Sequence, residues 1–443
     1  MARFLCVNPY IEDFAAYDLW LRPLGLLMLA EALQRSGHDI QFIDCLDRFH
    51  PHYSAADTHG YRSYHRGKYL KTPIEKPSVL SPMQRYFYRF GISEEHFHTH
   101  CHEMPMPDYI LITSMMTYWY TGVRYTINLL REQFPGVPIF LGGRYVFLNP
   151  QHAERYAGAD AIIQSITINR TLHELSRLTD GIVHDRGNAI DYPPAYTVYP
   201  VMPAVALLTS LGCPFTCNYC ATPVCMPEFS FRNHDAVIAE IHTYMKNNVT
   251  DIALYDDALL YQAEKHFIPL FSEIAAIRTT LSFHTPNGLH CRYITAEVAK
   301  LMYKSGFKTI RLSLETADYS LQRATGGKVT NTNFITAIEN LNAAGFQRNT
   351  IETYLMTGLP EQTVQQVLSS IRFAHQQGVI VRLAEYSPIP RTPLFVHAPK
   401  AVRDEPLLQN NLVYSTLFSP FTAEQQKIIK HEARHGNAIN RSR

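Results

Sequence analysis

The sequence lacks any apolar run of the roughly 20 residues that a membrane-spanning helix needs. It also lacks an excess of charge, because 40 Lys and Arg residues against 39 Asp and Glu residues give a net charge of +1. Binding to nucleic acid in general depends on a basic surface that neutralises phosphates. The opening residues MARFLC lead into a strand pattern without a signal peptide's apolar segment. We therefore expect a cytoplasmic protein with no membrane span and no nucleic-acid partner.

Cysteine is scarce too, with eight residues among 443, and these do not form the pattern of a disulfide framework. Three of the eight, Cys213, Cys217 and Cys220, fall within the ten-residue run LGCPFTCNYC. An apolar, strand-like stretch from Ala204 to Leu208 comes just before this run. The pattern predicts a loop at the end of a strand that presents three thiols to one point.

Three thiols so placed favour an iron–sulfur cluster over other metals. A [4Fe–4S] cluster normally takes four thiolates. Three thiolates leave one iron open, and that iron can chelate the amino and carboxylate groups of S-adenosylmethionine (SAM). Cys217 and Cys220 alone could instead be half of a zinc site or a redox pair. A zinc site would need a second pair nearby, and only Cys225, a fourth ligand or a bystander thiol, follows closely.

The spacing Cys-x3-Cys-x2-Cys, with Tyr219 just before the last cysteine, resembles the signature of the radical SAM superfamily. The resemblance implies that Cys213, Cys217 and Cys220 hold one [4Fe–4S] cluster, with Tyr219 beside the cofactors. One-electron reduction of SAM beside the cluster would then yield a 5′-deoxyadenosyl radical. It also implies a reductant such as flavodoxin or ferredoxin as a partner.

Short strands alternate with helical patterns along the whole chain, which predicts an α/β fold with parallel sheets. Residues 1–185 predict a Rossmann-like, doubly wound domain with an insertion at 50–107, followed by a linker at 186–203. Residues 204–400 repeat strand and helix six times, and six units in place of eight predict a partial (β/α)6 barrel of the TIM type. Catalytic residues should lie at the carboxyl ends of its strands. Residues 401–443 form a polar C-terminal extension.

The N-terminal half resembles the cobalamin-binding domain that precedes many radical SAM enzymes. The matching pieces are Pro23-Leu24-Gly25, Thr113 to Tyr120 and Leu141-Gly142-Gly143. The resemblance implies that Thr113, Thr117, Gly142 and Gly143 approach cobalamin. The Asp-x-His-x-x-Gly motif that supplies a histidine ligand to cobalt is absent, since Asp57-Thr58-His59-Gly60 has the wrong spacing. A residue between Thr113 and Trp119 would then face the lower side of cobalt. The alternative is a structural domain without a cofactor.

From about Arg3 to Phe395, the strand ends look like those of the cobalamin-associated radical SAM enzymes. The resemblance places Asp256 or Asp257 near the SAM amino group and Glu315 near the SAM ribose. It places the backbone around Tyr386 beside the adenine. Each carboxylate could instead cap a helix or form a surface ion pair. Arg391 stands where glycine is usual in the last of these motifs.

The insertion contains an alternating histidine tract, His96, His98, His100 and His102. On a strand, all four imidazoles would share one face and could bind a metal. On a helix they would be scattered, which favours solvated or packing histidines.

The resemblance implies methyl transfer to an unactivated carbon of an unknown small-molecule substrate, with a [4Fe–4S] cluster, SAM and cobalamin as cofactors. A radical rearrangement, cyclisation or oxidation assisted by cobalamin is the first alternative. A radical SAM enzyme without cobalamin is the second. A scaffold without catalysis is disfavoured, because it would not need an open iron.

Overall fold

The computed structural model describes residues 1–51, 63–184, 191–277 and 280–442. The Asp57–Gly60 segment lies outside these described residues. The chain divides into two compact units. The N-terminal unit comprises residues 1–203 and 399–409, and the barrel unit comprises residues 204–398 and 410–443.

The N-terminal unit is built on a five-stranded parallel sheet with strand order β10-β9-β8-β1-β4. Its strands are β1 (Arg3–Asn8), β4 (Asp39–Asp44), β8 (Tyr109–Ile112), β9 (Ile139–Leu141) and β10 (Ala161–Ile162). Chain connections run in opposite directions on either side of the β1–β8 pair. A doubly wound sheet has its crevice at such a switch point, beyond the carboxyl ends of the strands.

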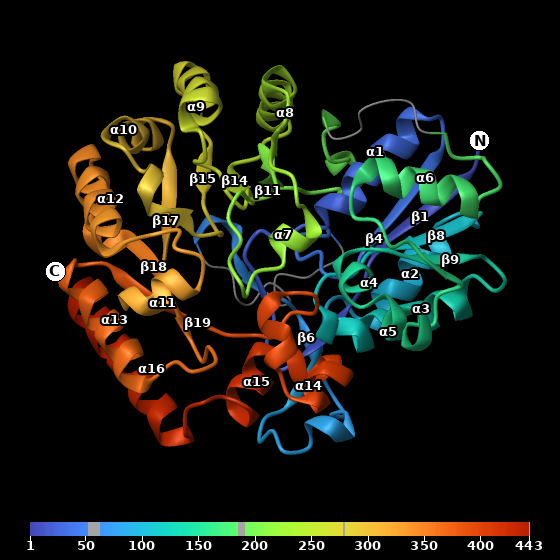
Figure 1. The fold of residues 1–443 in the computed structure, drawn as a ribbon. Coiled ribbons are helices and arrows are strands. Elements are labelled where there is room, and N and C mark those ends of the chain that lie inside the picture. Colours follow the sequence, from blue (N-terminus) through green and yellow to red (C-terminus); the bar gives the residue numbers. More distant parts are fainter. Residues whose placement is uncertain (52–62, 185–190, 278–279, 443) are drawn as a thin grey trace. The chain divides into compact units, whose positions relative to one another are not determined.

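Helices cover both faces of this sheet (Figure 1). They are α1 (Leu24–Arg35), α3 (Tyr120–Gln133), α4 (Arg144–Leu148), α5 (Pro150–Tyr156) and α6 (Ile168–Leu178). Helix α1 buries Leu29 and Leu33 in one core cluster with Phe4 of β1 and Leu175 of α6. The apolar strands and amphipathic helices thus fold as their patterns predict.

The insertion after β4 is structured wherever it is described. It contributes β5 (Gly67–Lys68), β6 (Lys71–Ile74), β7 (Phe87–Phe90) and helix α2 (Glu94–Glu103). Strand β7 pairs with both β6 and the short β2 (Ile11–Asp13), and β5 pairs with β3 (Tyr17–Asp18). Ser93 caps α2 by accepting a hydrogen bond from the backbone N–H of His96. The histidine tract is therefore helical.

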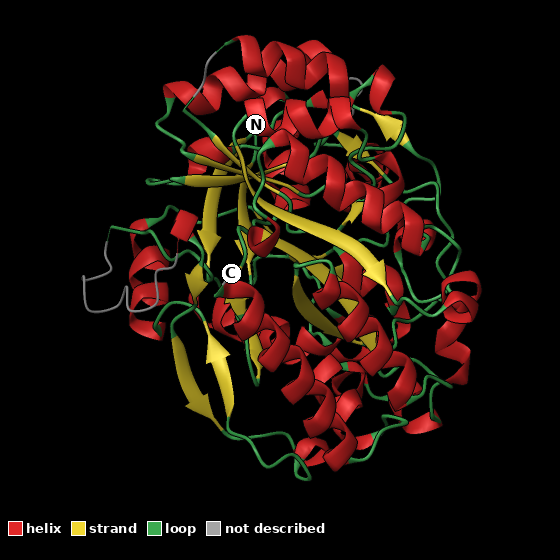
Figure 2. Ribbon diagram, turned by 90° about the vertical axis from the view of Figure 1, so that its left-hand side faces the viewer, coloured by secondary structure: helices red, strands yellow, loops and turns green. Residues whose placement is uncertain are grey.

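The barrel unit contains six parallel strands in the order β11-β14-β15-β17-β18-β19. The strands are β11 (Ala204–Leu207), β14 (Asp251–Leu254), β15 (Ser282–His284), β17 (Phe307–Glu315), β18 (Ile351–Thr357) and β19 (Ile380–Glu385). Their helices are α8 (His234–Lys246), α9 (Phe267–Ala276), α10 (Ala296–Lys304), α12 (Asn331–Ala344) and α13 (Val364–Gln376). These helices lie outside the strands (Figures 1 and 2). Among the described residues β11 and β19 do not pair, so the barrel is partial.

The open edge at β19 is covered by helix α16 (Ala423–Arg441). The Asn437 side chain accepts a hydrogen bond from the Val381 N–H at 2.7 Å and donates one to the Val381 carbonyl at 2.9 Å. An uncovered edge strand invites pairing with other chains, and this amide occupies both of its free groups at Val381. The expected polar tail is thus a docked helix, preceded by α14 (Lys400–Asp404) and α15 (Asn411–Leu417).

The described part of the chain contains no helix with the length and apolar character needed to cross a membrane.

Candidate functional site

The three-cysteine loop follows β11 and is shaped by a short hairpin. Strand β12 (Ser210–Leu211) pairs antiparallel with β13 (Ser230–Phe231), and helix α7 (Thr222–Cys225) closes the loop. Between hairpin and loop, Gly212 has φ +77°, and a Cβ there would lie 2.4 Å from the Glu228 carbonyl oxygen. Glycine is therefore required where the chain turns toward Cys213.

Asp256, at the end of β14, holds the start of this loop. Its Oδ1 accepts hydrogen bonds from the backbone N–H groups of Thr209 and Ser210, at 3.0 and 2.6 Å. Both hydroxyls donate to the same oxygen, at 2.8 and 2.6 Å. The carboxylate is only 3 % exposed and burial raises its pKa, although these hydrogen bonds lower it. The Asp256 carboxylate therefore serves to hold the loop in place. The other expected partner for the SAM amino group, Asp257, is half-buried and interacts electrostatically with Cys213.

The three thiols form one electrostatic group. Burial raises the pKa of Cys213 to about 11, and Cys217 and Cys220 add to this rise. All three are free thiols, and Cys217 is the most buried. Within the described residues, no group of three or more His, Cys, Asp or Glu side chains converges on one metal ion. A cubane does not require convergence, because each thiolate binds a different iron. The donor set therefore fits a cluster better than a single zinc ion.

A buried ion pair lies next to Cys217. Lys328 Nζ is 2.8 Å from Glu315 Oε1, and both side chains are about 12–13 % exposed. Burial acts to lower the pKa of Lys328, but Glu315, Tyr219 and Cys217 outweigh it and hold the pKa well above its usual value. The ammonium therefore stays charged beside the thiol, where it lowers the pKa of Cys217 against the effect of burial. Lys328 is a site residue that sequence reasoning missed.

Glu315 itself sits in strained backbone. It ends β17 with φ +65°, and the pairing with β18 shifts register between Ser313 and Glu315. A non-glycine residue in the left-handed region costs roughly 1–3 kcal/mol, and such residues gather at functional sites. The bulge directs this carboxylate to Lys328 and to the buried hydroxyl of Tyr219, whose pKa is raised by burial and then by Glu315. Glu315, Lys328 and Tyr219 thus form one cluster beside the cysteine loop.

The loop before Lys328 packs directly on Cys217. Gly326 has φ +116°, and a Cβ there would lie 3.3 Å from the Cα and 3.4 Å from the Sγ of Cys217. The Asn218 side chain donates from Nδ2 to the Ala324 carbonyl at 3.0 Å. The backbone carbonyl of Asn218 accepts a hydrogen bond from the Leu394 N–H at 3.1 Å. The cysteine loop is therefore fixed from two sides.

The other strand ends of the barrel unit are tied together by side-chain amides. Asn287 donates to the Tyr255 carbonyl at 2.8 Å, which links the ends of β14 and β15. Gln362 accepts from the Gly358 N–H at 2.9 Å and donates to the Met356 carbonyl at 3.1 Å.

The last expected cofactor loop carries two informative residues. Tyr386 is 3 % exposed, its ring packs edge-on against Tyr414 at 5.6 Å, and burial raises its pKa. Arg391 has φ +68°, so it adopts the conformation for which glycine is favoured at this position. The turn thus keeps the glycine-like conformation despite its side chain.

In the N-terminal unit, the loops after β8 and β9 contact one another. Ser114 Oγ donates to the Gly142 carbonyl at 2.6 Å, and a Cβ on Gly143, whose φ is +98°, would lie 2.2 Å from the Ser114 carbonyl oxygen. This contact between the two loops is sufficient to explain why residue 143 is glycine, without a bound ligand. Thr113 is half-buried, while buried Thr117 donates to Gln409 Oε1 at 2.6 Å.

The histidine tract does not form a metal site. Helix α2 distributes the four imidazoles around its axis, and no metal-binding group was found among the described residues. The alternating pattern resembled that of a strand, but the Ser93 cap and two glutamates in the first turn fix a helix.

Comparison with known proteins identifies the barrel unit. Residues 207–374 match the family model of the Radical SAM superfamily, so this segment is a radical SAM domain. The family implies a [4Fe–4S] cluster and SAM as cofactors.

Two curated relatives are methyltransferases by name. An uncharacterized methyltransferase of Pyrococcus horikoshii is 23 % identical over 360 residues, 72 % of this chain and 76 % of the relative. Bacteriochlorophyllide d C-8(2)-methyltransferase of Chlorobaculum tepidum is 25 % identical over 161 residues, 33 % of this chain and 35 % of the relative.

Two solved structures share the fold across both units. TsrM, a radical SAM methyltransferase from Kitasatospora setae solved with tryptophan substrate and a SAM analogue, matches with a TM-score of 0.64 and 14 % identity. That match covers 90 % of this chain and 76 % of TsrM. The cobalamin-dependent radical SAM enzyme OxsB matches with a TM-score of 0.59 and 12 % identity, over 92 % of this chain and 56 % of OxsB. The expected fold class, a Rossmann-like domain followed by a partial radical SAM barrel, is therefore confirmed.

Proposed function

We propose that this enzyme transfers a methyl group from SAM to an unactivated carbon of a small-molecule substrate, with cobalamin as a third cofactor. The observation that carries the proposal is the fold match to TsrM over 90 % of the chain, because a barrel alone would serve any radical SAM reaction. TsrM has also been solved with cobalamin and a [4Fe–4S] cluster bound. The names of both curated relatives support methyl transfer as the reaction type.

In this proposal, Cys213, Cys217 and Cys220 hold the cluster, and one iron stays open for SAM. When bound, the cluster supplies the electron that cleaves SAM, and cobalamin supplies a carrier for the methyl group. Asp257 accepts a hydrogen bond from the SAM amino group, because Asp256 is already engaged with Thr209 and Ser210.

The remaining groups position SAM. Glu315 binds the ribose hydroxyls, and Lys328 orients its carboxylate through their 2.8 Å ion pair. The buried hydroxyl of Tyr219 interacts electrostatically with that pair and with Cys217. The backbone that follows buried Tyr386 flanks the adenine.

Cobalamin is proposed to bind beyond the carboxyl ends of β1, β8 and β9, at the switch point of the sheet. The loop from Thr113 to Trp119 then faces the lower side of cobalt. It offers half-buried Met115 and exposed Met116 but no histidine. The Gln409 hydrogen bond to Thr117 fixes this loop.

Labelled methyl transfer is the test of the reaction. The full chain is reconstituted anaerobically with iron, sulfide and hydroxocobalamin, then incubated with methyl-labelled SAM, a reductant and cell extract. We expect a labelled product that requires cobalamin. Cys217→Ala abolishes it, and Cys225→Ala, in the same loop but outside the three-cysteine pattern, preserves it. A product that carries no label would favour a rearrangement or oxidation, and a labelled product without added cobalamin would favour the cobalamin-free alternative.

The electron paramagnetic resonance spectrum of cob(II)alamin on the protein tests the cobalt environment separately. We expect no nitrogen superhyperfine splitting from an axial base, because the loop offers no imidazole. Clear nitrogen splitting would refute this ligand assignment. Loss of all cobalamin on desalting would refute the binding site.

A further inference from the structure

A pocket of about 250 Å³ in the N-terminal unit is lined by residues to which the proposed function gives no role. It lies where the edge strand β4 ends, between helix α2 and residues 198–200. This place is one strand away from the β1–β8 switch point. Apolar walls come from Phe42, Ile92 and Met104, and the polar lining residues are Asp44, Asp47, His50, His100, Glu103 and Tyr199. Ligand sites in proteins typically combine apolar walls with a small number of convergent polar groups.

The buried charges next to this pocket do not balance. Arg22 and Arg48 both pair with Asp18, at 3.5 and 3.0 Å, and all three side chains are at most 8 % exposed. Asp44 and Asp47, both buried, interact electrostatically with Arg22. Among the described residues, two guanidinium groups stand against three carboxylates, which leaves one negative charge uncompensated. Buried charges without a partner are costly, so this charge calls for a proton or a cation.

The uncompensated charge falls on Asp47. Asp44 is already satisfied, since it accepts hydrogen bonds from Asn8 at 2.6 Å, from the Leu46 N–H at 2.8 Å and from the Tyr199 hydroxyl at 2.6 Å. Asp47 accepts only one, from the Phe49 N–H to Oδ1 at 2.9 Å. Its Oδ2 has no hydrogen-bond or ion-pair partner among the described residues, although the side chain is 6 % exposed and lines the pocket.

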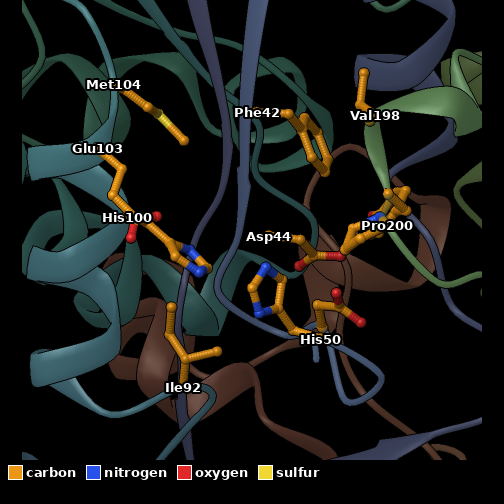
Figure 3. Close-up of a pocket in the computed structure, with 11 residues that line it drawn as sticks. Phe42, Asp44, His50, Ile92, His100, Glu103, Met104, Val198 and Pro200 are labelled. Atoms are coloured by element: carbon orange, nitrogen blue, oxygen red, sulfur yellow. The ribbon is translucent and has the colours of Figure 1, made fainter. Parts of the chain in front are cut away.

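Two imidazoles complete the polar side of the pocket. His50 and His100 reach toward its middle from different elements, with Asp44 beside them (Figure 3). Their ring centroids lie 4.4 Å apart. They do not form a metal site with the carboxylates, because no three such groups in the described chain share one ion. The two rings pack against each other, with 55° between their planes.

We propose that this pocket binds a small organic cation, a primary ammonium group on an apolar body, with Asp47 as its counter-ion. The ammonium donates to Asp47 Oδ2, and the apolar body contacts Phe42, Ile92 and Met104. Burial, then Asp44, raises the pKa of Asp47 to about 7, against the opposing effect of Arg22, so the ligand displaces a proton at neutral pH.

Calorimetric titration of the full chain with n-hexylammonium chloride tests the proposal. Hexanol, which has the same apolar body without the charge, is the ligand control. We expect hexylammonium to bind at least about tenfold more tightly than hexanol, because charge-assisted hydrogen bonds are roughly twice as strong as neutral ones. Asp47→Asn should remove this difference.

Two variants distinguish the site from general effects. Asp39→Asn, at the exposed start of the same strand, should bind hexylammonium like the wild type. Met104→Trp should fill the pocket and abolish binding of both ligands. Equal binding of hexylammonium and hexanol, or unchanged hexylammonium binding in a folded Asp47→Asn protein, overturns the proposal. Binding of Zn²⁺ but not hexylammonium at Asp47 also overturns it, in favour of a metal site.

Discussion

At the scale of single residues, adjacent carboxylates have different environments. Asp256 Oδ1 accepts four hydrogen bonds from Thr209 and Ser210, while Asp257 interacts electrostatically with Cys213. Asp256→Ala should lower the free energy of unfolding by about 3 kcal/mol or more, since each buried donor left unsatisfied costs roughly 1–3 kcal/mol. Urea unfolding and iron content per chain measure this, and we expect cluster loss as well.

Asp257→Ala is the matched control for that variant. It should unfold within about 1 kcal/mol of the wild type, as substitutions away from buried networks do. Its iron content should be unchanged, and its affinity for SAM should fall. If the two variants lose iron equally, Asp256 has no special role in the loop.

Asp47 predicts an unusual pH dependence of stability. Its pKa of about 7 in the folded chain lies above the unfolded value of about 3.9. The folded state therefore binds more protons, and stability is lost as pH rises from about 4 through 7. Asp44 and Asp18 raise its pKa and Arg22 lowers it, and His50, His100 and Glu103 line the same pocket.

Asp47→Asn should remove this loss and raise stability at pH 8 by up to about 4 kcal/mol, since one pKa unit corresponds to roughly 1.4 kcal/mol. At pH 4 the two proteins should unfold alike. The check is urea unfolding across pH 4–8, and parallel curves for the two proteins would contradict the assignment.

At the scale of elements, the glycine pair before Lys328 tests how the cysteine loop is held. A Cβ on Gly326 would press on Cys217, whereas Gly327, also at positive φ, has open space around it. Gly326→Ala should therefore lose cluster content and SAM cleavage. Gly327→Ala should keep both, at a strain cost of roughly 1–2 kcal/mol. Iron analysis after desalting measures the difference, and equal retention would show that the contact is unimportant.

The elements also show what local sequence can predict. The strand Tyr109–Ile112 lies on an apolar run of the sequence, whereas the last barrel strand begins at Ile380, two residues before the start that the pattern predicts. The sequence predicted a polar tail in place of helix α16, because few residues of this helix are buried. The hydrogen bond between its Asn437 and Val381 joins residues that are far apart in the sequence. Lys328 was not predicted as a site residue, because its ion-pair partner Glu315 lies 13 residues earlier in the sequence and only the fold brings the two together. The three cysteines, by contrast, lie within ten residues of one another, so their spacing could be recognised from the sequence alone.

At the scale of the whole molecule, the C-terminal segment contributes to both units. Residues 399–409 belong to the N-terminal unit and residues 410–443 to the barrel unit. Gln409→Ala would leave the Thr117 hydroxyl without its acceptor and loosen the loop proposed for cobalamin. We expect weaker cobalamin retention on desalting, with cluster content unchanged. Gln365→Ala, at an exposed position on α13, is the control, and equal retention in both would contradict the proposed loop.

The proposed function requires that the three thiols hold a cluster with an open iron, so SAM cleavage by the reconstituted chain tests it most directly. Wild-type protein and the variant with Cys213, Cys217 and Cys220 replaced by alanine are compared under anaerobic conditions with SAM and dithionite. The measured product is 5′-deoxyadenosine. We predict slow formation by the wild type and by Cys225→Ala, and none by the triple variant. Formation by the triple variant, or none by wild type that holds about four iron per chain, would contradict the account.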